Sequence, residues 1–200
     1  MEQEGILSKR VRDFSKWADV IQTVLIYLVA LLVPTFLGEL LKSMFAADSI
    51  VVTKSQIIIG SIVNTALIMT AINLKGWPKI LGIITMPSIA TILGGYVFKT
   101  ASVFMVYMIP AIWIGNFALV FAYKLIMLAK EKNYFLAGIV GIVVKVAIIF
   151  GVFSLLNAFG IFPPKVAKML QIAMSTTQAI TATIGMVIAF AIYKVEIIKK

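Results

Sequence analysis

The chain has no cysteine and no histidine, and these absences exclude several kinds of chemistry. They rule out disulfides, thiolate nucleophiles and metal sites with His or Cys ligands, as well as Ser-His-Asp and Cys-His catalysis. The eight acidic residues are scattered and lie mostly near the chain ends, which disfavours a carboxylate metal site. We therefore expect no enzyme activity, no metal and no cofactor, because no nucleophile with a base and no carboxylate pair is present.

Charged residues are also scarce, at 13% of the chain, whereas 62% of residues are hydrophobic. A soluble domain has about 25% charged and about 45–50% apolar residues. Apolar stretches of about 20 residues, the length that crosses a bilayer, recur along the whole chain. We therefore predict an all-α integral membrane protein. The first sixteen residues are polar and amphipathic, and no small-residue cleavage site follows them, so we expect no removable signal peptide.

The hydrophobic pattern predicts six transmembrane helices, at residues 17–41, 57–73, 80–98, 103–128, 134–156 and 166–193. Pro34, Pro87 and Pro110 lie inside these spans, where proline is tolerated and is expected to kink the helix. The third and fourth spans are alternatively a mixture of shorter helices, because the Gly94-Gly95 pair weakens the helix there.

The basic residues give the chain a net charge of +10 and predict its orientation. Twelve lysines and arginines fall on the side that carries both termini and five on the other, so both termini should be cytoplasmic. We expect a multi-pass protein of the cell (plasma) membrane, with a cytoplasmic segment at 1–16, a transmembrane domain at 17–193 and a cytoplasmic tail at 194–200. Basic residues at span ends meet lipid headgroups, so the charge does not imply nucleic acid.

Lys145 lies in the middle of the fifth predicted span, so its ammonium would lie near the membrane midplane. A cation there costs about 2.5–3.5 kcal/mol on insertion scales and marks a functional site by default. Gly138 and Gly141 share its helical face, and glycine lets a neighbouring backbone approach closely. Lys145 should therefore point into the bundle rather than into lipid.

The sequence leaves the partner of Lys145 open. It is a set of backbone carbonyls freed near Pro34 or Pro110, a water-filled cavity, or an anionic group of a ligand. Glu39 lies near the outer end of the first span and reaches Lys145 only if that helix bends at Pro34. The long outer connections, residues 42–56 and 157–165, are either lids over a site or ordinary linkers.

The sixth predicted span carries polar and small residues on one helical stripe, at Gln171, Ser175, Gln178, Ala182 and Gly185. The stripe is polar toward the outer end and small toward the inner end. Such a stripe avoids lipid and faces protein or a cavity. It predicts either a ligand site in the outer half above a tightly packed inner half, or contacts between helices along its whole length.

Trp113 and Asn116 are three residues apart on the fourth predicted span and share a face. Trp113 is too deep for the interfacial aromatic belt. The pair offers either a stacking surface and hydrogen bonds for a planar ligand, or a packing Trp whose N–H meets a carbonyl. Asn64 lies in the middle of the second span, and we interpret it as a structural residue that bonds across helices.

Three short stretches resemble the S components of energy-coupling factor (ECF) transporters, which capture vitamins and related micronutrients in bacteria and archaea. They are PSIAT at residues 87–91 with Gly94-Gly95, IPAIWIGN at 109–116 and QAITATIG at 178–185. The resemblance implies a small molecule bound under the outer loops, and docking to a coupling subunit driven by two cytoplasmic ATPases. Many S components dock through an Ala-x-x-x-Ala surface on the first span, whereas this span has only Ala18, Ala30 and Gly38.

The sequence therefore favours the substrate-binding subunit of a bacterial or archaeal micronutrient importer. Its predicted substrate-binding residues are Lys145, Trp113, Asn116, Gln171, Ser175 and Gln178, with Lys145 favouring a ligand carboxylate or phosphate. The alternative is a non-transporting membrane scaffold or assembly partner in a larger complex, in which the polar stripes are contacts between proteins. A homo-oligomeric channel is disfavoured, because no acidic residue lies deep in a span to form a ring.

Overall fold

The computed structural model describes residues 5–11, 13–46, 48–94 and 102–198, and every regular element in that part of the chain is helical. The predicted all-α fold is confirmed. The elements in chain order are η1 (Ile6–Ser8), α1 (Lys16–Leu32), η2 (Val33–Leu37), α2 (Gly38–Met44), α3 (Ile50–Thr53), α4 (Ser55–Asn73), α5 (Trp77–Gly94), α6 (Ser102–Met105), η4 (Val106–Met108), α7 (Ile109–Ala122), η5 (Tyr123–Ala129), α8 (Tyr134–Ala158), α9 (Pro164–Met174) and α10 (Thr176–Ile198).

Five helical segments in the described part of the chain are long and apolar enough to cross a membrane: Lys16–Met44, Ser55–Asn73, Val103–Ala129, Tyr134–Ala158 and Pro164–Val195. They match the first, second, fourth, fifth and sixth predicted spans. The third predicted span appears as α5, and residues 95–98, with Gly95 of the family-like stretch, lie outside the described residues. Several membrane crossings are thus supported, whereas the number six and the cytoplasmic side of the termini stay predictions.

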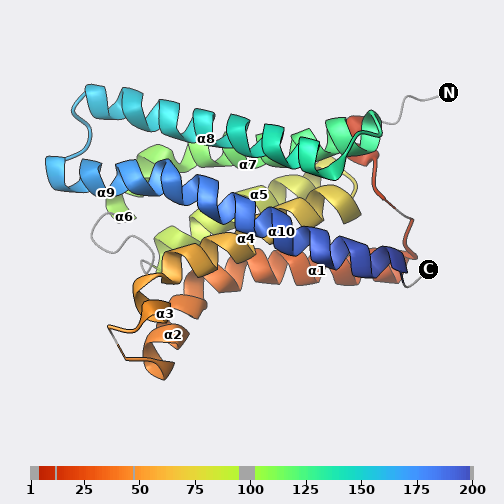
Figure 1. The fold of residues 1–200 in the computed structure, drawn as a ribbon, viewed down its shortest axis with the longest axis horizontal. Coiled ribbons are helices and arrows are strands. Elements are labelled where there is room, and N and C mark those ends of the chain that lie inside the picture. The colour runs from red at the N-terminus through yellow and green to blue at the C-terminus, as the bar shows by residue number, and fades with distance from the viewer. Residues whose placement is uncertain (1–4, 12, 47, 95–101, 199–200) are drawn as a thin grey trace.

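Helix α4 forms the centre of the bundle, and every residue from Asn64 to Leu74 is buried. It packs most extensively against α10, while α7 pairs with α8 and α1 lies against α5 and α4 (Figure 1). The outer faces of α1 and α8 expose large apolar side chains such as Leu25 and Val143, which suits a lipid environment. The first described residues and the end of α10 lie at one end of the bundle, called here the terminal end, and α9 lies at the opposite, far end (Figure 1).

The prolines act differently in the three predicted spans that carry them. Pro34 lies in the π-helical stretch η2, because a residue without an N–H interrupts the hydrogen-bond ladder of the preceding turn. Pro87 lies inside α5. Pro110 occupies the first turn of α7, where proline is well tolerated, so it starts a helix rather than kinking one. The fourth predicted span consists of the shorter helices α6, η4, α7 and η5, which agrees with the alternative of several shorter helices.

The sixth predicted span is divided into two helices. Ser175 has φ −112° and ψ −93°, outside the helical region, and separates α9 from α10. The sequence predicts one continuous helix here because serine at this position carries no strong stop signal.

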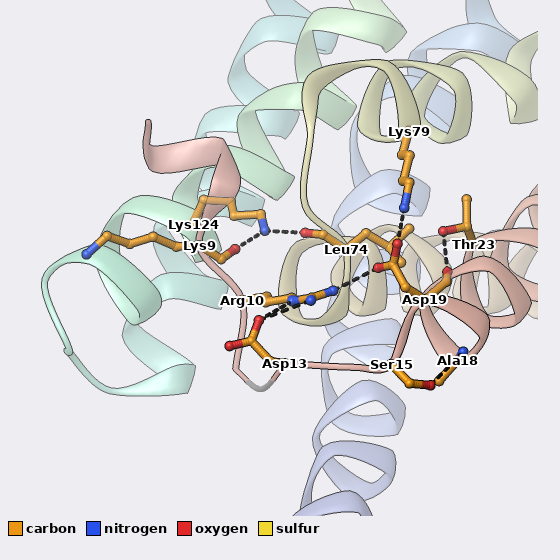
Figure 2. A network of polar contacts seen from close by, with 10 residues as sticks. All are labelled: Lys9, Arg10, Asp13, Ser15, Ala18, Asp19, Thr23, Leu74, Lys79 and Lys124. Carbon is orange, nitrogen blue, oxygen red and sulfur yellow. Dashed lines mark hydrogen bonds and ion pairs between the residues drawn. The ribbon is translucent and has the colours of Figure 1, made fainter. Parts of the chain in front are cut away.

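Polar contacts tie the N-terminal segment, residues 5–11 and 13–15, across the terminal end of the bundle (Figure 2). Lys124 of η5 is completely buried, and its ammonium donates to the backbone carbonyls of Lys9 and Leu74. Leu74 is the C-cap residue directly after α4, so this cation satisfies a carbonyl that has no partner within the helix. Arg10 donates to Asp19 of α1 over 2.8 Å, and Lys79 of α5 pairs with the same carboxylate. The segment therefore connects the ends of α1, α4, α5 and η5.

Candidate functional site

A cavity of ≈ 110 Å³ lies in the half of the bundle away from the terminal end. On α4 it extends over two turns, from Gln56 near the helix start to Asn64. None of the described residues that line it is acidic. Its polar lining residues are Gln56 and Asn64 of α4, Ser88 of α5, Asn116 of α7, Lys145 of α8, and Thr177, Gln178 and Thr181 of α10.

Lys145 lines this cavity from the middle of α8. Its side chain is 2% exposed, which confirms the prediction that it points into the bundle. Gly115 of α7 makes room for the lysine stem, since a Cβ at that position would lie 3.3 Å from Lys145 Cγ and 2.8 Å from Ile149 Cγ1. The close approach of α7 and α8 therefore depends on this glycine as well as on those of α8.

The ammonium of Lys145 donates to the side-chain oxygen of Asn64 over 2.6 Å. The amide nitrogen of Asn64 in turn donates to the carbonyl of Gly60 over 2.8 Å and to the hydroxyl of Thr181 over 3.2 Å. These bonds join α8, α4 and α10, and they confirm the prediction that Asn64 bonds across helices. Lysine has three donor hydrogens, and a neutral amide does not compensate its charge. The cavity thus contains a cation without a carboxylate among its described lining residues.

Glu39 does not fill that role. It lies on α2 with its side chain 65% exposed, and it pairs with Lys42 over 3.0 Å. Pro34 does line the cavity, as expected for a helix that is interrupted near the site. Of the partners that the sequence left open for Lys145, the structure has a cavity. The hydrogen bond from Lys145 to Asn64 is an additional contact that the sequence did not predict.

The α5 and α7 side of the cavity presents two further polar groups. Asn116 is 3% exposed and its amide donates to the carbonyl of Ile84 over 3.1 Å, one turn before Pro87. Pro87 has no N–H for the carbonyl of Ile83, four residues earlier, and the Asn116 amide adds a donor at the adjacent carbonyl of this perturbed turn. Ser88 is 5% exposed, and its hydroxyl has no hydrogen-bond partner within the described part of the chain. It is therefore a donor and acceptor that a ligand in the cavity can use.

The break at Ser175 separates the members of the predicted polar stripe. Gln178 lines the cavity from the first turn of α10. Ser175 donates its hydroxyl to the carbonyl of Gln171 over 2.5 Å, and Gln171 is exposed on α9. Neither residue lines the cavity. The predicted stripe requires one continuous helical period. Because Ser175 is not helical, the residues before it and after it do not share one helical face.

The small residues of α10 pack against α4 on the side of the cavity that faces the terminal end. A Cβ at Gly185 would lie 2.7 Å from Asn64 Cβ, 2.9 Å from the Thr65 nitrogen and 3.0 Å from the Ser61 carbonyl oxygen. The Thr65 hydroxyl has two carbonyl acceptors in reach, that of Ser61 at 2.9 Å on its own helix and that of Gly185 at 3.3 Å across the contact. The predicted contrast between a polar half of this helix and a tightly packed half is therefore present, beginning at α10 rather than at α9.

Trp113 lies outside the cavity although Asn116, one turn later on α7, lines it. Trp113 is half-buried, and its indole nitrogen has no partner among the described residues. The structure thus brings together three of the six predicted residues, Lys145, Asn116 and Gln178. Ser88, Thr181 and Gln56 line the cavity without having been selected from the sequence, where isolated hydroxyl and amide residues in apolar helices carried no spacing signal.

Comparison of the chain with family models, with curated proteins and with solved structures gave no match. The functional argument therefore rests on the geometry of the cavity.

Proposed function

We propose that this chain binds a small anionic molecule in the membrane and acts as the substrate-binding subunit of an importer, the role of S components in ECF transporters. The observation that carries the proposal is the buried Lys145 ammonium in a cavity without a lining carboxylate among the described residues. A buried cation costs free energy unless an opposite charge compensates it, and a ligand carboxylate or phosphate supplies that charge. Ser88, Asn116 and Gln178 add polar groups that orient a bound molecule.

The volume of the cavity limits what fits inside it. A cavity of about 150 Å³ holds a benzene molecule, so ≈ 110 Å³ suits a molecule of that scale or the charged end of a longer one. Met105, Ala173 and Met174 supply apolar wall from α6 and α9. A ligand with one anionic group and a short apolar body matches both parts of the lining.

Transport in this proposal requires a coupling subunit in the plasma membrane and two ATPases on its cytoplasmic side. The small residues Ala18, Ala30 and Gly38 of the first span offer no exposed pair for such docking, because Ala30 and Gly38 are buried in the bundle and Ala18 is half-buried. The exposed side of α1 instead presents Trp17, Ile21 and Leu25. Docking to a coupling subunit would therefore use a surface different from an Ala-x-x-x-Ala face.

Native mass spectrometry of the purified full chain tests the proposal directly. We expect a small molecule to co-purify with the wild type and to be lost from Lys145→Met. Lys168→Met is the matched control, since Lys168 is an exposed cation on α9. If nothing co-purifies and Lys145→Met leaves cellular uptake intact, the binding role of Lys145 is wrong.

A membrane scaffold or assembly partner is the second candidate, and the interhelical hydrogen bonds around Asn64 favour it. Lys145, Asn64 and Thr181 connect three helices without any ligand. In that case these residues only hold the bundle together, and a pull-down recovers a stoichiometric membrane partner that is unrelated to ATPases.

A further inference from the structure

A second pocket lies at the terminal end of the bundle, far along α4 from the cavity around Lys145. It has a volume of ≈ 300 Å³ and lies between the N-terminal segment, the connection from α4 to α5, and η5. Its lining residues are Ser8, Lys9, Arg10, Asp13, Lys75 and Leu128, so all but Leu128 are polar or charged. A polar pocket of this kind suits a charged group rather than an apolar ligand.

Positive charge exceeds negative charge around this pocket. Lys9, Arg10 and Lys75 line it together with one carboxylate, Asp13. Arg10 already binds that carboxylate over 3.0 Å as well as Asp19 over 2.8 Å. Neither the Lys9 nor the Lys75 ammonium has an ion-pair partner in the described part of the chain. Two cations therefore remain for an anion from outside.

The backbone that carries these cations is fixed before any anion binds. The ammonium of Lys124 holds the carbonyl of Lys9, and the N–H of Gly76 donates to the carbonyl of Leu7 over 3.4 Å. The second bond joins the N-terminal segment to the residue that follows Lys75. Figure 2 shows the Lys9 side chain directed away from the Arg10 guanidinium, which is engaged with Asp13 and Asp19. A pre-organised site loses less conformational entropy when it binds.

We propose that this pocket binds a phosphate group, carried either by an anionic lipid headgroup or by free phosphate. Lysine ammonium groups are common phosphate ligands, and the pocket lies at the ends of membrane-spanning helices, the level of lipid headgroups. The positive-inside pattern places this end at the cytoplasmic leaflet, where anionic lipids are abundant. The site is independent of the cavity around Lys145.

The test compares two charge-matched double variants of the full chain. Lys9→Gln/Lys75→Gln removes the two pocket cations and leaves the Lys9 carbonyl in place for Lys124. Lys130→Gln/Lys132→Gln removes two exposed cations of the η5–α8 connection, outside the pocket. Each protein, with its fold checked by circular dichroism, is titrated with phosphatidylglycerol and with phosphatidylcholine and analysed by native mass spectrometry. Its thermal unfolding is also followed in inorganic phosphate and in chloride at equal ionic strength.

A lipid headgroup is supported as the source if the wild type retains phosphatidylglycerol in preference to phosphatidylcholine. Binding of phosphatidylglycerol should then be about ten-fold or more weaker in the pocket variant and unchanged in the control variant. Stabilisation by inorganic phosphate that only the pocket variant loses supports free phosphate. If the two double variants respond alike to both probes, or the pocket variant behaves as the wild type, the proposal is wrong.

Discussion

The ammonium of Lys145 and the side-chain oxygen of Asn64 lie 2.6 Å apart, so a neutral amide faces the cation in the middle of α8. The hydrogen bond satisfies one of three donor hydrogens, and it leaves the charge uncompensated among the described residues of the cavity. The same pair of residues thus bears on the stability of the bundle and on the anion binding that we propose, and the two roles make different predictions.

Asn64→Asp places a carboxylate where the amide oxygen now accepts from Lys145. The variant supplies the missing charge internally, so we expect it to bind the anionic ligand at least about ten-fold more weakly than the wild type. Stability should change little, because the gained charge pair offsets the lost donations to the Gly60 carbonyl and the Thr181 hydroxyl. Ligand occupancy is read by native mass spectrometry, and wild-type occupancy in this variant would contradict the anion-binding role.

Asn64→Leu and Lys145→Met together test the structural role through a double-mutant cycle. Asn64→Leu alone leaves a buried cation without its partner and should lower the free energy of unfolding by roughly 2–4 kcal/mol. Lys145→Met alone removes the buried charge and should be close to neutral or stabilising. The double variant should therefore be more stable than Asn64→Leu in thermal unfolding. Strict additivity would show that the two side chains are not energetically coupled.

Gly185→Ala should destabilise the contact between α4 and α10. The new Cβ would lie 2.9 Å from the Thr65 nitrogen and 3.0 Å from the Ser61 carbonyl oxygen, and these backbone atoms cannot move aside as a side chain can. We expect a loss of about 1–3 kcal/mol. Gly151→Ala is the control, because a Cβ there would meet no atom within 4 Å outside its own stretch of helix. It should be neutral or stabilising, since alanine favours helix by about 1 kcal/mol.

Lys124→Met should release the N-terminal segment from the terminal end of the bundle. The Lys9 and Leu74 carbonyls would both lose the ammonium that they share. Hydrogen exchange at the Val11 amide, which donates to the Ile72 carbonyl over 3.0 Å, should become about ten-fold faster or more. Lys130→Met, an exposed cation six residues along the chain, should leave that exchange rate unchanged. Equal exchange rates in both variants would show that Lys124 does not hold the segment.

Sequence reasoning succeeded where a residue reports on its own helix. The apolar runs gave the long helices, and the glycine face of α8 gave the inward direction of Lys145, because both follow from composition and the helical period. The sequence also predicts that Asn64 bonds across helices, because an amide in an apolar run needs a hydrogen-bond partner.

Sequence reasoning did not identify which helices face one another. The pairing of Lys145 with Asn64 joins residues 81 positions apart, and one sequence carries no information on that contact. From the sequence, Lys124 is only one of the twelve basic residues assigned to the side of the termini, whereas in the structure it lies in η5 and is completely buried. The three predicted residues outside the cavity, Trp113, Gln171 and Ser175, were selected by a helical period that assumes an unbroken helix or a single facing direction.

The break at Ser175 also divides one wall of the cavity between two helices. Helix α9 is joined to α10 through this one non-helical residue, while α10 is held on α4 by the Gly185 and Thr181 contacts. Ala173 and Met174 line the cavity from α9, whereas Thr177, Gln178 and Thr181 line it from α10. At this wall α9 therefore supplies apolar contacts only, and the polar groups come from the helix on the other side of the break.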